Sequence, residues 1–343
     1  MNVNRKKICI VATVPFALRW FMASHIKGLS KVYDVTLVTN GRTEDLLGLI
    51  DENVSFIPML IKREISIKND FVALIKLYWL FRCNHFDAVH SIFPKSGLLA
   101  MLAANLARVP FRTHTFTGQV WVNKCGFRRR VLKFFDEVIV MNATQVLADS
   151  KSQCQFLIDN QVVKGSSIFV LADGSVAGVD LERFKYKDNV HNEIRKQNEI
   201  PDDAIVFLFL GRLTIDKGLV DLFQAFVIAA KSNKDIHLLI VGPDEEGFEV
   251  SLMELSEQFP GRIHSVGLTN HPENYMSASD VLCLPSYREG FGNVLIEAAS
   301  VGLPSIASRI YGITDAVENG VTGILHDPKS VTEISSAMLL LGS

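Results

Sequence analysis

The feature that most constrains the fold is a regular alternation of short apolar runs with longer segments of helical spacing, repeated in both halves of the chain. This alternation predicts βαβ units, in which parallel strands are joined by crossover helices. A chain of 343 residues is long enough for two hydrophobic cores. The sequence therefore predicts an α/β protein with two doubly wound, Rossmann-like domains facing each other across a cleft, and ligands beyond the carboxyl ends of the strands.

In the N-terminal half, the predicted strands are residues 7–12, 34–39, 54–59, 86–90 and 111–116, and the predicted helices are 20–31, 71–81 and 98–108. The pattern breaks near residues 166–180, where a strand over 168–171 leads into glycine-containing turns and then into the polar stretch 185–199. Few apolar residues there could join the two cores, so we place the domain boundary in this segment. The predicted domains are residues 1–175 and 176–343.

The second half repeats the alternation. Its predicted strands are residues 204–210, 236–241, 262–266, 281–285 and 304–307, and its predicted helices are 218–230, 249–258, 273–279, 293–301 and 331–340. The nearly continuous apolar run 204–210 is typical of a central strand covered on both faces. Because the sequence stops in or just after an apolar helical run, we expect either a missing C-terminal segment or an unusually short chain.

Charge and cysteine content narrow the class of protein. Residues 1–175 carry a net charge of +9 and residues 176–343 a net charge of −11. The basic half suits anionic lipid or a phosphate-bearing acceptor, unless the halves differ in charge without a functional cause. A pI near 6.5 argues against nucleic-acid binding. The scattered cysteines, without Cys-x-x-Cys or zinc spacing, indicate reduced thiols in a cytoplasmic protein.

Membrane insertion is not expected from the hydropathy pattern. The apolar run 8–12 is too short for a signal peptide, and no stretch approaches the ~20 residues of a spanning helix. Two stretches combine basic and aromatic residues, 68–82 and 124–135. We expect the first to be mainly core, because it is apolar on most sides. We expect the second to lie at the surface, on an anionic membrane, because Arg128, Arg129 and Arg130 cannot all be buried.

A glycine-bounded loop with two cations follows the apolar strand 204–210. It reads Gly211-Arg212-Leu213-Thr214-Ile215-Asp216-Lys217-Gly218. Arg212 can hold phosphate oxygens in bidentate fashion and Lys217 adds a point charge, so the pair can offset the charge of a departing diphosphate. The alternative is a solvated loop with ordinary surface charges.

A second constellation follows the strand 281–285. It reads Glu289-Gly290-Phe291-Gly292-Asn293-Val294-Leu295-Ile296-Glu297. The glycines let a ligand approach the backbone, and a helix that starts near Asn293 offers N–H groups to phosphates. Glu297, about one turn into that helix, can accept both hydroxyls of a ribose, whereas Glu289 on the loop can contact sugar hydroxyls. The alternative for Glu297 is a carboxylate favoured by the helix dipole.

These motifs resemble glycosyltransferase family 4, the retaining enzymes of the GT-B fold. Residues 284–297 resemble its Glu-x7-Glu signature, and Gly211, Arg212 and Lys217 resemble its phosphate-binding loop. Gly178-Val179-Asp180, with later turns over 312–323, matches its order. The resemblance implies that Arg212 and Lys217 hold the diphosphate and that Glu289 contacts the transferred sugar. It further implies that the donor site includes Gly290, Phe291, Gly292, Asn293, Val294, Leu295 and Glu297.

The N-terminal half resembles a subgroup that builds capsule, O-antigen or N-glycan precursors on a polyprenyl diphosphate lipid, through residues 114–121. We expect His114 to face the cleft as a catalytic residue, although a histidine at a strand end is often structural. Thr115, Thr117 and Gly118 are expected on the acceptor side. The loop 13–19 lacks the glycines that many family members have there, which puts its acceptor contacts in doubt.

The implied reaction transfers a sugar from a UDP-sugar, with an N-acetylated hexosamine or related hexose expected, to a polyprenyl-diphosphate-linked saccharide. No cofactor or metal is expected, and no acidic pair suits Mg²⁺ beside a diphosphate. We expect a cytoplasmic protein peripheral on the inner face of the membrane. A nucleotide-sugar epimerase and a non-catalytic sugar-nucleotide-binding protein stay open as alternatives. A dinucleotide oxidoreductase and a P-loop ATPase lack their glycine motifs here.

Overall fold

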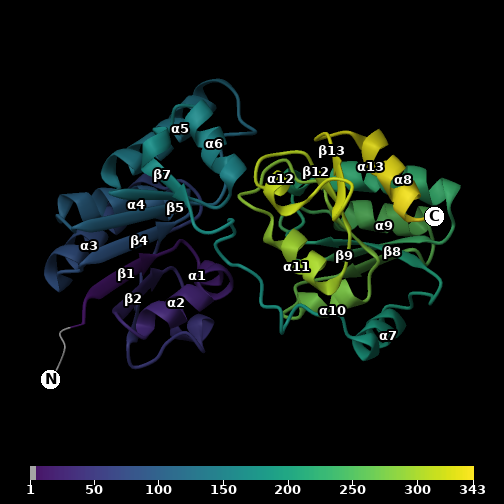
Figure 1. The fold of residues 1–343 in the computed structure, drawn as a ribbon, viewed down its shortest axis with the longest axis horizontal. Coiled ribbons are helices and arrows are strands. Elements are labelled where there is room, and N and C mark those ends of the chain that lie inside the picture. The colour runs from purple at the N-terminus through teal and green to yellow at the C-terminus, as the bar shows by residue number, and fades with distance from the viewer. Residues whose placement is uncertain (1–4) are drawn as a thin grey trace. The chain divides into compact units, whose positions relative to one another are not determined.

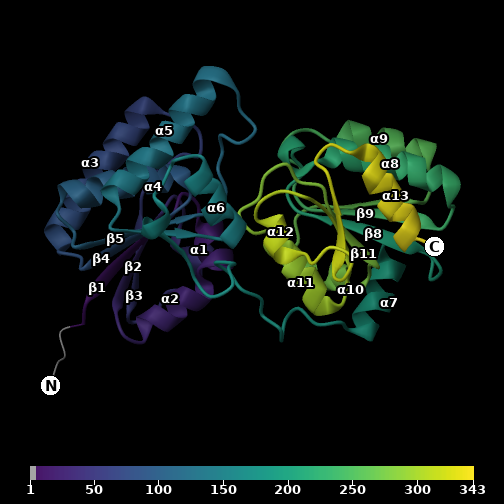
Figure 2. The same ribbon diagram turned by 45° about the horizontal axis from the view of Figure 1, so that its top comes forward.

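The computed structural model describes residues 5–343, and the chain divides into two compact units after Gly178. The boundary predicted from the sequence, after residue 175, lies three residues earlier. Figures 1 and 2 show each unit as a sheet covered by helices on both faces. Over the described residues, the paired strands of both sheets run parallel, as βαβ connections require.

Unit 1 contains a sheet whose strands, among the described residues, follow the order β3-β2-β1-β4-β5-β6-β7. The strands are β1 (Lys7–Val11), β2 (Asp34–Thr39), β3 (Val54–Pro58), β4 (Ala88–Ile92), β5 (Phe111–Phe116), β6 (Gln145–Ala148) and β7 (Ile168–Val170). The helices are α1 (Pro15–Phe21), α2 (Ala23–Ser30), α3 (Ile67–Asn84), α4 (Pro94–Leu106), α5 (Gly126–Asn142) and α6 (Lys151–Asp159), with short 3₁₀ turns at Thr43–Leu46 and Gly165–Ser167.

Alternation along the strands of unit 1 separates two hydrophobic layers. Cys9 and Val11 of β1 point to the layer under α3, α4 and α5, whereas Ile10 points to the layer under α1 and α2. Figure 2 shows these two groups of helices on opposite faces of the sheet. The strand order reverses between β1 and β4, which is where doubly wound sheets bind ligands.

Unit 2 contains a second parallel sheet, with the order β10-β9-β8-β11-β12-β13 in the described part of the chain. The strands are β8 (Ile205–Leu210), β9 (Ile236–Val241), β10 (Ile263–Val266), β11 (Val281–Leu284), β12 (Ser305–Ser308) and β13 (Gly323–His326). The helices are α7 (Asp188–Gln197), α8 (Leu219–Ser232), α9 (Glu249–Gln258), α10 (Pro272–Ser277), α11 (Asn293–Val301), α12 (Ile313–Ala316) and α13 (Val331–Leu341), with a 3₁₀ turn at Ile215–Lys217.

The central strand β8 of unit 2 is covered on both faces, as its apolar run predicts. Phe207 and Phe209 pack under α8, α9 and α13, and Val206 and Leu208 pack toward α10 and α11. The prediction of two doubly wound, Rossmann-like domains is therefore confirmed. In unit 2, both sequence motifs follow the carboxyl ends of strands, one after β8 and the other after β11.

Several local expectations were wrong. The helix expected over residues 20–31 is two helices, α1 and α2, which meet at Met22. The expectation omitted α5, β6, α6, α12 and β13. Residues 185–199, interpreted as a polar junction, contain α7, which belongs to unit 2. Its Arg195 is 3% exposed, pairs with Asp280 at 2.8 Å and donates to the backbone oxygen of Ala278. These bonds attach α7 to the unit together with the buried side chain of Ile194.

Candidate functional site

The loop after β8 carries both cations of the first motif, and each is paired with a carboxylate. Nη1 of Arg212 donates to Oε2 of Glu245 at 2.6 Å, and Nζ of Lys217 lies 2.5 Å from Oε1 of Glu289. The Arg212 side chain is 40% exposed and the Lys217 side chain 21% exposed, so both stay accessible to an incoming anion. The loop therefore presents two cations whose charge is already balanced by the protein.

The Lys217–Glu289 contact joins the two motifs that the sequence singled out. The residues are 72 positions apart, on the loop after β8 and on the loop between β11 and α11. Because β8 and β11 are neighbours in a parallel sheet, their following loops meet at the same edge. The Glu289 side chain is only 14% exposed, so the ion pair is shielded from screening by solvent.

Helix α11 begins at Asn293, as predicted. Gly292 is its N-cap, with φ at +80°, and has no side chain to cap the helix. The positive end of the helix dipole therefore lies at the end of the loop between β11 and α11, which we call the signature loop, beside the buried Phe291. The N–H of Leu295, which the resemblance assigns to phosphate binding, donates to the carbonyl of Gly292 at 2.8 Å. The Leu295 side chain packs into the core beneath.

Glu297 lies one turn further along α11, beside an arginine that is bonded to another carboxylate. Nε and Nη2 of Arg183 donate to Oε2 of Glu273 at 3.0 and 2.8 Å. Burial raises the pKa of Glu297 to about 7, the positive charge of Arg183 opposes this, and the charge of Glu273 adds to it. The ribose carboxylate implied by the resemblance is thus half ionised near neutral pH.

His114 does not lie where the sequence suggested. Its side chain is 0% exposed and lies on the α4 side of the sheet, where a Cβ added to Gly97 would come 2.4 Å from Cε1. Oγ of Ser91 bonds Nδ1 at 2.8 Å, and burial lowers the pKa of His114 to about 3. The expectation of a cleft-facing catalytic histidine is therefore corrected: strand alternation turns residue 114 inward, as a neutral core histidine.

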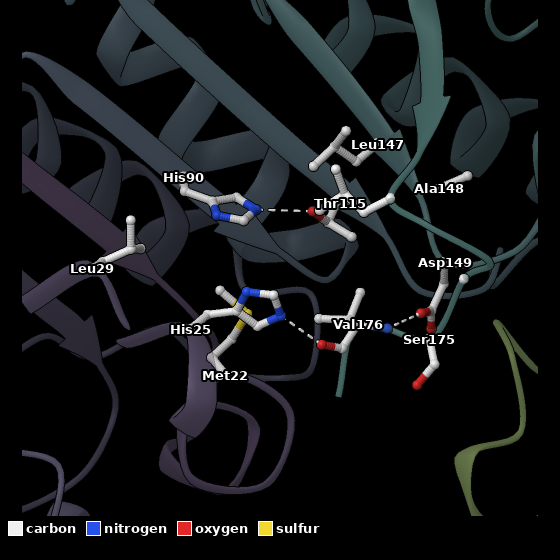
Figure 3. Close-up of a pocket in the computed structure, with 12 residues that line it drawn as sticks. Met22, His25, Leu29, His90, Thr115, Leu147, Ala148, Asp149, Ser175 and Val176 are labelled. Carbon is white, nitrogen blue, oxygen red and sulfur yellow. Dashed lines mark hydrogen bonds between the residues drawn. The ribbon is translucent and has the colours of Figure 1, made fainter. Parts of the chain in front are cut away.

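The acceptor-side residues lie at the carboxyl end of β5. Thr115 is on the opposite face of the strand from His114 and borders a cavity of about 80 Å³ within unit 1 (Figure 3). Its Oγ1 bonds Nε2 of His90 at 2.8 Å, and His25 reaches the carbonyl of Val176 at 2.7 Å. Thr117 is half-buried, and Gly118, with φ at +108°, lies two residues after the end of β5 at Phe116.

The segment that follows β7, residues 171–176, forms one wall of this cavity. The N–H of Val176 donates to Oδ1 of Asp149 at 2.6 Å. Figure 3 shows this hydrogen bond beside Ser175. Burial, followed by the charge of His25, lowers the pKa of His90 to about 4, so the imidazole is neutral at pH 7. A volume of about 80 Å³ has room for waters but is smaller than a sugar site needs.

The two basic and aromatic stretches form α3 and α5. The core interpretation of α3 holds for Leu77 and Phe81, which are buried, but is wrong for Phe71 and Trp79, which are 62% and 57% exposed. The surface interpretation of α5 matches its exposed positions, where Phe127 is 78% exposed and the three consecutive arginines are exposed.

Sequence reasoning missed the residues that hold the two motif loops together. Asp221 is the one acidic residue in the first turn of α8 and is 9% exposed, which an aspartate within the apolar run 219–226 could have signalled. Tyr287 donates from its hydroxyl to Oδ2 of Asp221 at 2.6 Å. The Arg183–Glu273 pair spans 90 positions and has no local signal.

Neither a membrane-spanning helix nor a metal-binding cluster occurs in the described part of the chain. Between residues 5 and 343, no helix combines the length and apolarity needed to cross a membrane. In the same range, no three or more histidine, cysteine, aspartate or glutamate side chains are grouped so as to hold a metal ion.

Two Rossmann-like units with these motifs define the class of GT-B glycosyltransferases. Comparison with known families supports this assignment over most of the chain: residues 7–150 match the family described as glycosyl transferase 4-like, and residues 190–341 match glycosyl transferases group 1. The chain belongs to these glycosyltransferases, and the resemblance seen in its sequence is confirmed.

Individual relatives agree with the family. The chain is 32% identical over 338 residues to the capsular polysaccharide biosynthesis glycosyltransferase CapM of Staphylococcus aureus, covering 96% of this chain and 87% of CapM. It is 28% identical over 313 residues to the Escherichia coli UDP-Gal:alpha-D-GlcNAc-diphosphoundecaprenol alpha-1,3-galactosyltransferase, covering 90% and 79%. The crystal structure of Anabaena Alr3699/HepE in complex with UDP and glucose superposes with a TM-score of 0.76 at 18% identity, covering 97% and 88%.

Proposed function

We propose that this glycosyltransferase moves a sugar, an N-acetylated hexosamine or related hexose, from a UDP-sugar to a polyprenyl-diphosphate-linked saccharide during bacterial surface glycan assembly. The observation that carries the proposal is the meeting of Lys217 with Glu289, with Arg212 on the same loop. The names of the relatives support the substrate classes, since one takes UDP-Gal and a diphosphoundecaprenol-linked sugar and another belongs to capsule synthesis.

The proposed chemistry uses the two cations on the leaving group. The bond between the anomeric carbon and the diphosphate oxygen breaks, and Arg212 and Lys217 balance the negative charge that develops. The acceptor hydroxyl attacks on the same face and its proton passes to a diphosphate oxygen, so configuration is retained. Glu289 holds a hydroxyl of the transferred sugar and Glu297 holds the ribose. No step is assigned to His114, because its side chain is buried.

A first experiment measures thermal shifts with uridine, guanosine and cytidine diphosphate sugars. A donor at a hundred times its Kd should stabilise the protein by about 2.7 kcal/mol. Transfer to a synthetic polyprenyl-diphosphate glycan, with the anomeric configuration of the product determined by NMR, then tests acceptor class and retention. An inverted product, or transfer abolished by EDTA and restored by Mg²⁺, would contradict the retaining, metal-independent part of the proposal.

The two alternative functions predict different outcomes of the same assay. An epimerase would change the configuration of the UDP-sugar without any acceptor. A non-catalytic sugar-nucleotide-binding protein would bind the donor and turn over nothing. Transfer that depends on the lipid-linked acceptor supports the transferase over both.

We also propose that unit 1 lies on an anionic membrane through α3 and α5. On α3, Ile67, Phe71, Ile75 and Trp79 follow a four-residue spacing and are 42–83% exposed. Exposed basic residues flank them, as suits a helix at a charged interface.

Vesicle binding tests this face with a matched control. Arg128→Gln with Arg130→Gln should weaken binding to phosphatidylglycerol vesicles in a salt-dependent way. Lys27→Gln with Lys31→Gln removes the same charge from α2 and its C-cap, on the other face of the sheet, and should leave binding nearly unchanged. Equal losses in both pairs would indicate attraction by net charge only.

A further inference from the structure

Tyr287, in the signature loop, makes hydrogen bonds to residues before and after Lys217 in the chain. Its backbone N–H donates to the carbonyl of Asp216 at 2.9 Å, one residue before the lysine. Its hydroxyl donates to Oδ2 of Asp221 at 2.6 Å, in the first turn of α8. A single residue of one loop therefore fixes both ends of the short segment that carries the lysine in the other loop.

Two further contacts hold the same segment. The guanidinium of Arg288 lies 3.3 Å from Oδ2 of Asp216. Gly218 adopts φ at +74°, and a Cβ at this position would lie 2.0 Å from the carbonyl oxygen of Pro285. Only glycine allows this approach of backbone to backbone. The two loops are thus in contact from residue 216 to residue 218, with Lys217 in the middle.

The surroundings of the Tyr287–Asp221 hydrogen bond stabilise it. Asp221 is 9% exposed, and the ammonium of Lys329 lies 5.4 Å from the centre of the Tyr287 ring. Burial, followed by the bond to Asp221 and its charge, raises the pKa of Tyr287, so the hydroxyl stays protonated and donates. Hydrogen bonds to a charged acceptor are stronger than those between neutral groups.

We propose that Tyr287 and Asp221 are positioning residues that hold the ammonium of Lys217 where the donor diphosphate binds. Lysine has a flexible side chain and provides a point charge, so its effect on a phosphate depends on where its backbone is held. The inference rests on the proposed function, because it assumes that a nucleoside diphosphate occupies this site. In this proposal both residues act through Lys217 rather than by touching the ligand.

The test compares UDP with UMP, which keeps the nucleoside but lacks the second phosphate. Tyr287→Phe removes the hydroxyl and keeps the ring beneath Lys329. We expect the affinity for UDP, measured by calorimetry, to fall on the order of tenfold, with a much smaller change for UMP. Tyr275→Phe, a hydroxyl removed from α10 of the same unit, is the matched control and should change neither affinity.

A second series examines the acceptor of the bond and the lysine. Asp221→Ala should reproduce the loss of UDP affinity, whereas Asp221→Asn keeps an oxygen acceptor and should recover most of it. In a Lys217→Met background, Tyr287→Phe should cause no further loss, because the group that it positions is gone. A merely structural role would lower Tm and change the affinities for UDP and UMP in equal proportion.

The outcomes separate this inference from the proposed function. If the wild-type protein binds no UDP, or if Lys217→Met leaves UDP affinity unchanged, the proposed donor site is wrong. If Lys217→Met weakens UDP binding but Tyr287→Phe and Asp221→Ala do not, the donor site stands and the positioning role is refuted.

Discussion

The pKa of Glu297 leads to a quantitative prediction for donor binding. Burial raises this pKa from 4.5 to about 7. If the ionised carboxylate accepts the ribose hydroxyls, only the ionised fraction binds well. That fraction is about 0.1 at pH 6 and about 0.9 at pH 8, so the apparent Kd for UDP should be about tenfold higher at pH 6.

The substitution Glu297→Gln provides the comparison that isolates this carboxyl group. The glutamine variant should bind UDP more weakly at pH 8 and should lose the steep dependence on pH between 6 and 8. The phosphates of UDP also titrate near pH 6, but they do so equally in both proteins. Calorimetry at several pH values therefore reads the contribution of Glu297 from the difference between the two curves. Identical pH profiles in the two proteins would refute the reasoning.

The same shift makes a prediction about stability, with the opposite sign. The pKa of Glu297 is higher in the folded protein than in the unfolded chain, so its contribution to stability is present below pH 4.5 and is lost as pH rises through about 7. Glu297→Gln removes the buried charge and should raise Tm at pH 8 but not at pH 5. Higher stability with weaker nucleotide binding is the signature expected of a binding residue.

Three further predictions concern other groups. Arg212→Ala or Lys217→Ala should lower kcat/KM for transfer by more than about tenfold, measured with a saturating acceptor; full activity in both would contradict the site. Glu289→Gln should increase the affinity for UDP, measured by calorimetry, and should lower the rate of sugar transfer. His237, stacked on His264 with a 3.1 Å contact, has a pKa lowered to about 4, first by burial. His237 is neutral in the folded protein and takes up a proton more readily in the unfolded chain, so Tm should fall as pH drops from 6.5 to 4. The fall should be smaller in His237→Phe.

The sequence predicted the central strands of unit 2 well because both faces of that sheet are buried, whereas it missed the edge strand β13. Runs such as 204–210 and 236–241 are apolar throughout and have no other stable place than a covered central strand. The charged α7 was missed for the complementary reason. Only two of its ten residues are apolar, Val190 and Ile194, and the rest of its attachment depends on Arg195 and its long-range partners.

For the candidate site, the family resemblance predicted that both loops serve one donor site, but not which way a side chain points. Neighbouring strands in a parallel sheet bring the loops of Lys217 and Glu289 together, and the structure agrees. His114 was misjudged because alternation gives two possible faces, and only the packing of α4 on β5 selects the buried one. Likewise, α3 is apolar on most sides, so periodicity alone could not show that Phe71 and Trp79 face outward.

The pairing of both cations with carboxylates explains why Glu289 should affect binding and transfer in opposite directions. In the free site, Lys217 is neutralised by Glu289, and a diphosphate must replace that carboxylate to gain the lysine. Removing the competing charge therefore favours UDP. In the proposed complex, with the lysine on the diphosphate, the released Glu289 carboxylate would accept a hydrogen bond from a hydroxyl of the donor sugar. The ion pair thus holds both side chains at the site before the donor arrives, and its exchange for the diphosphate is complete before charge develops on the leaving group.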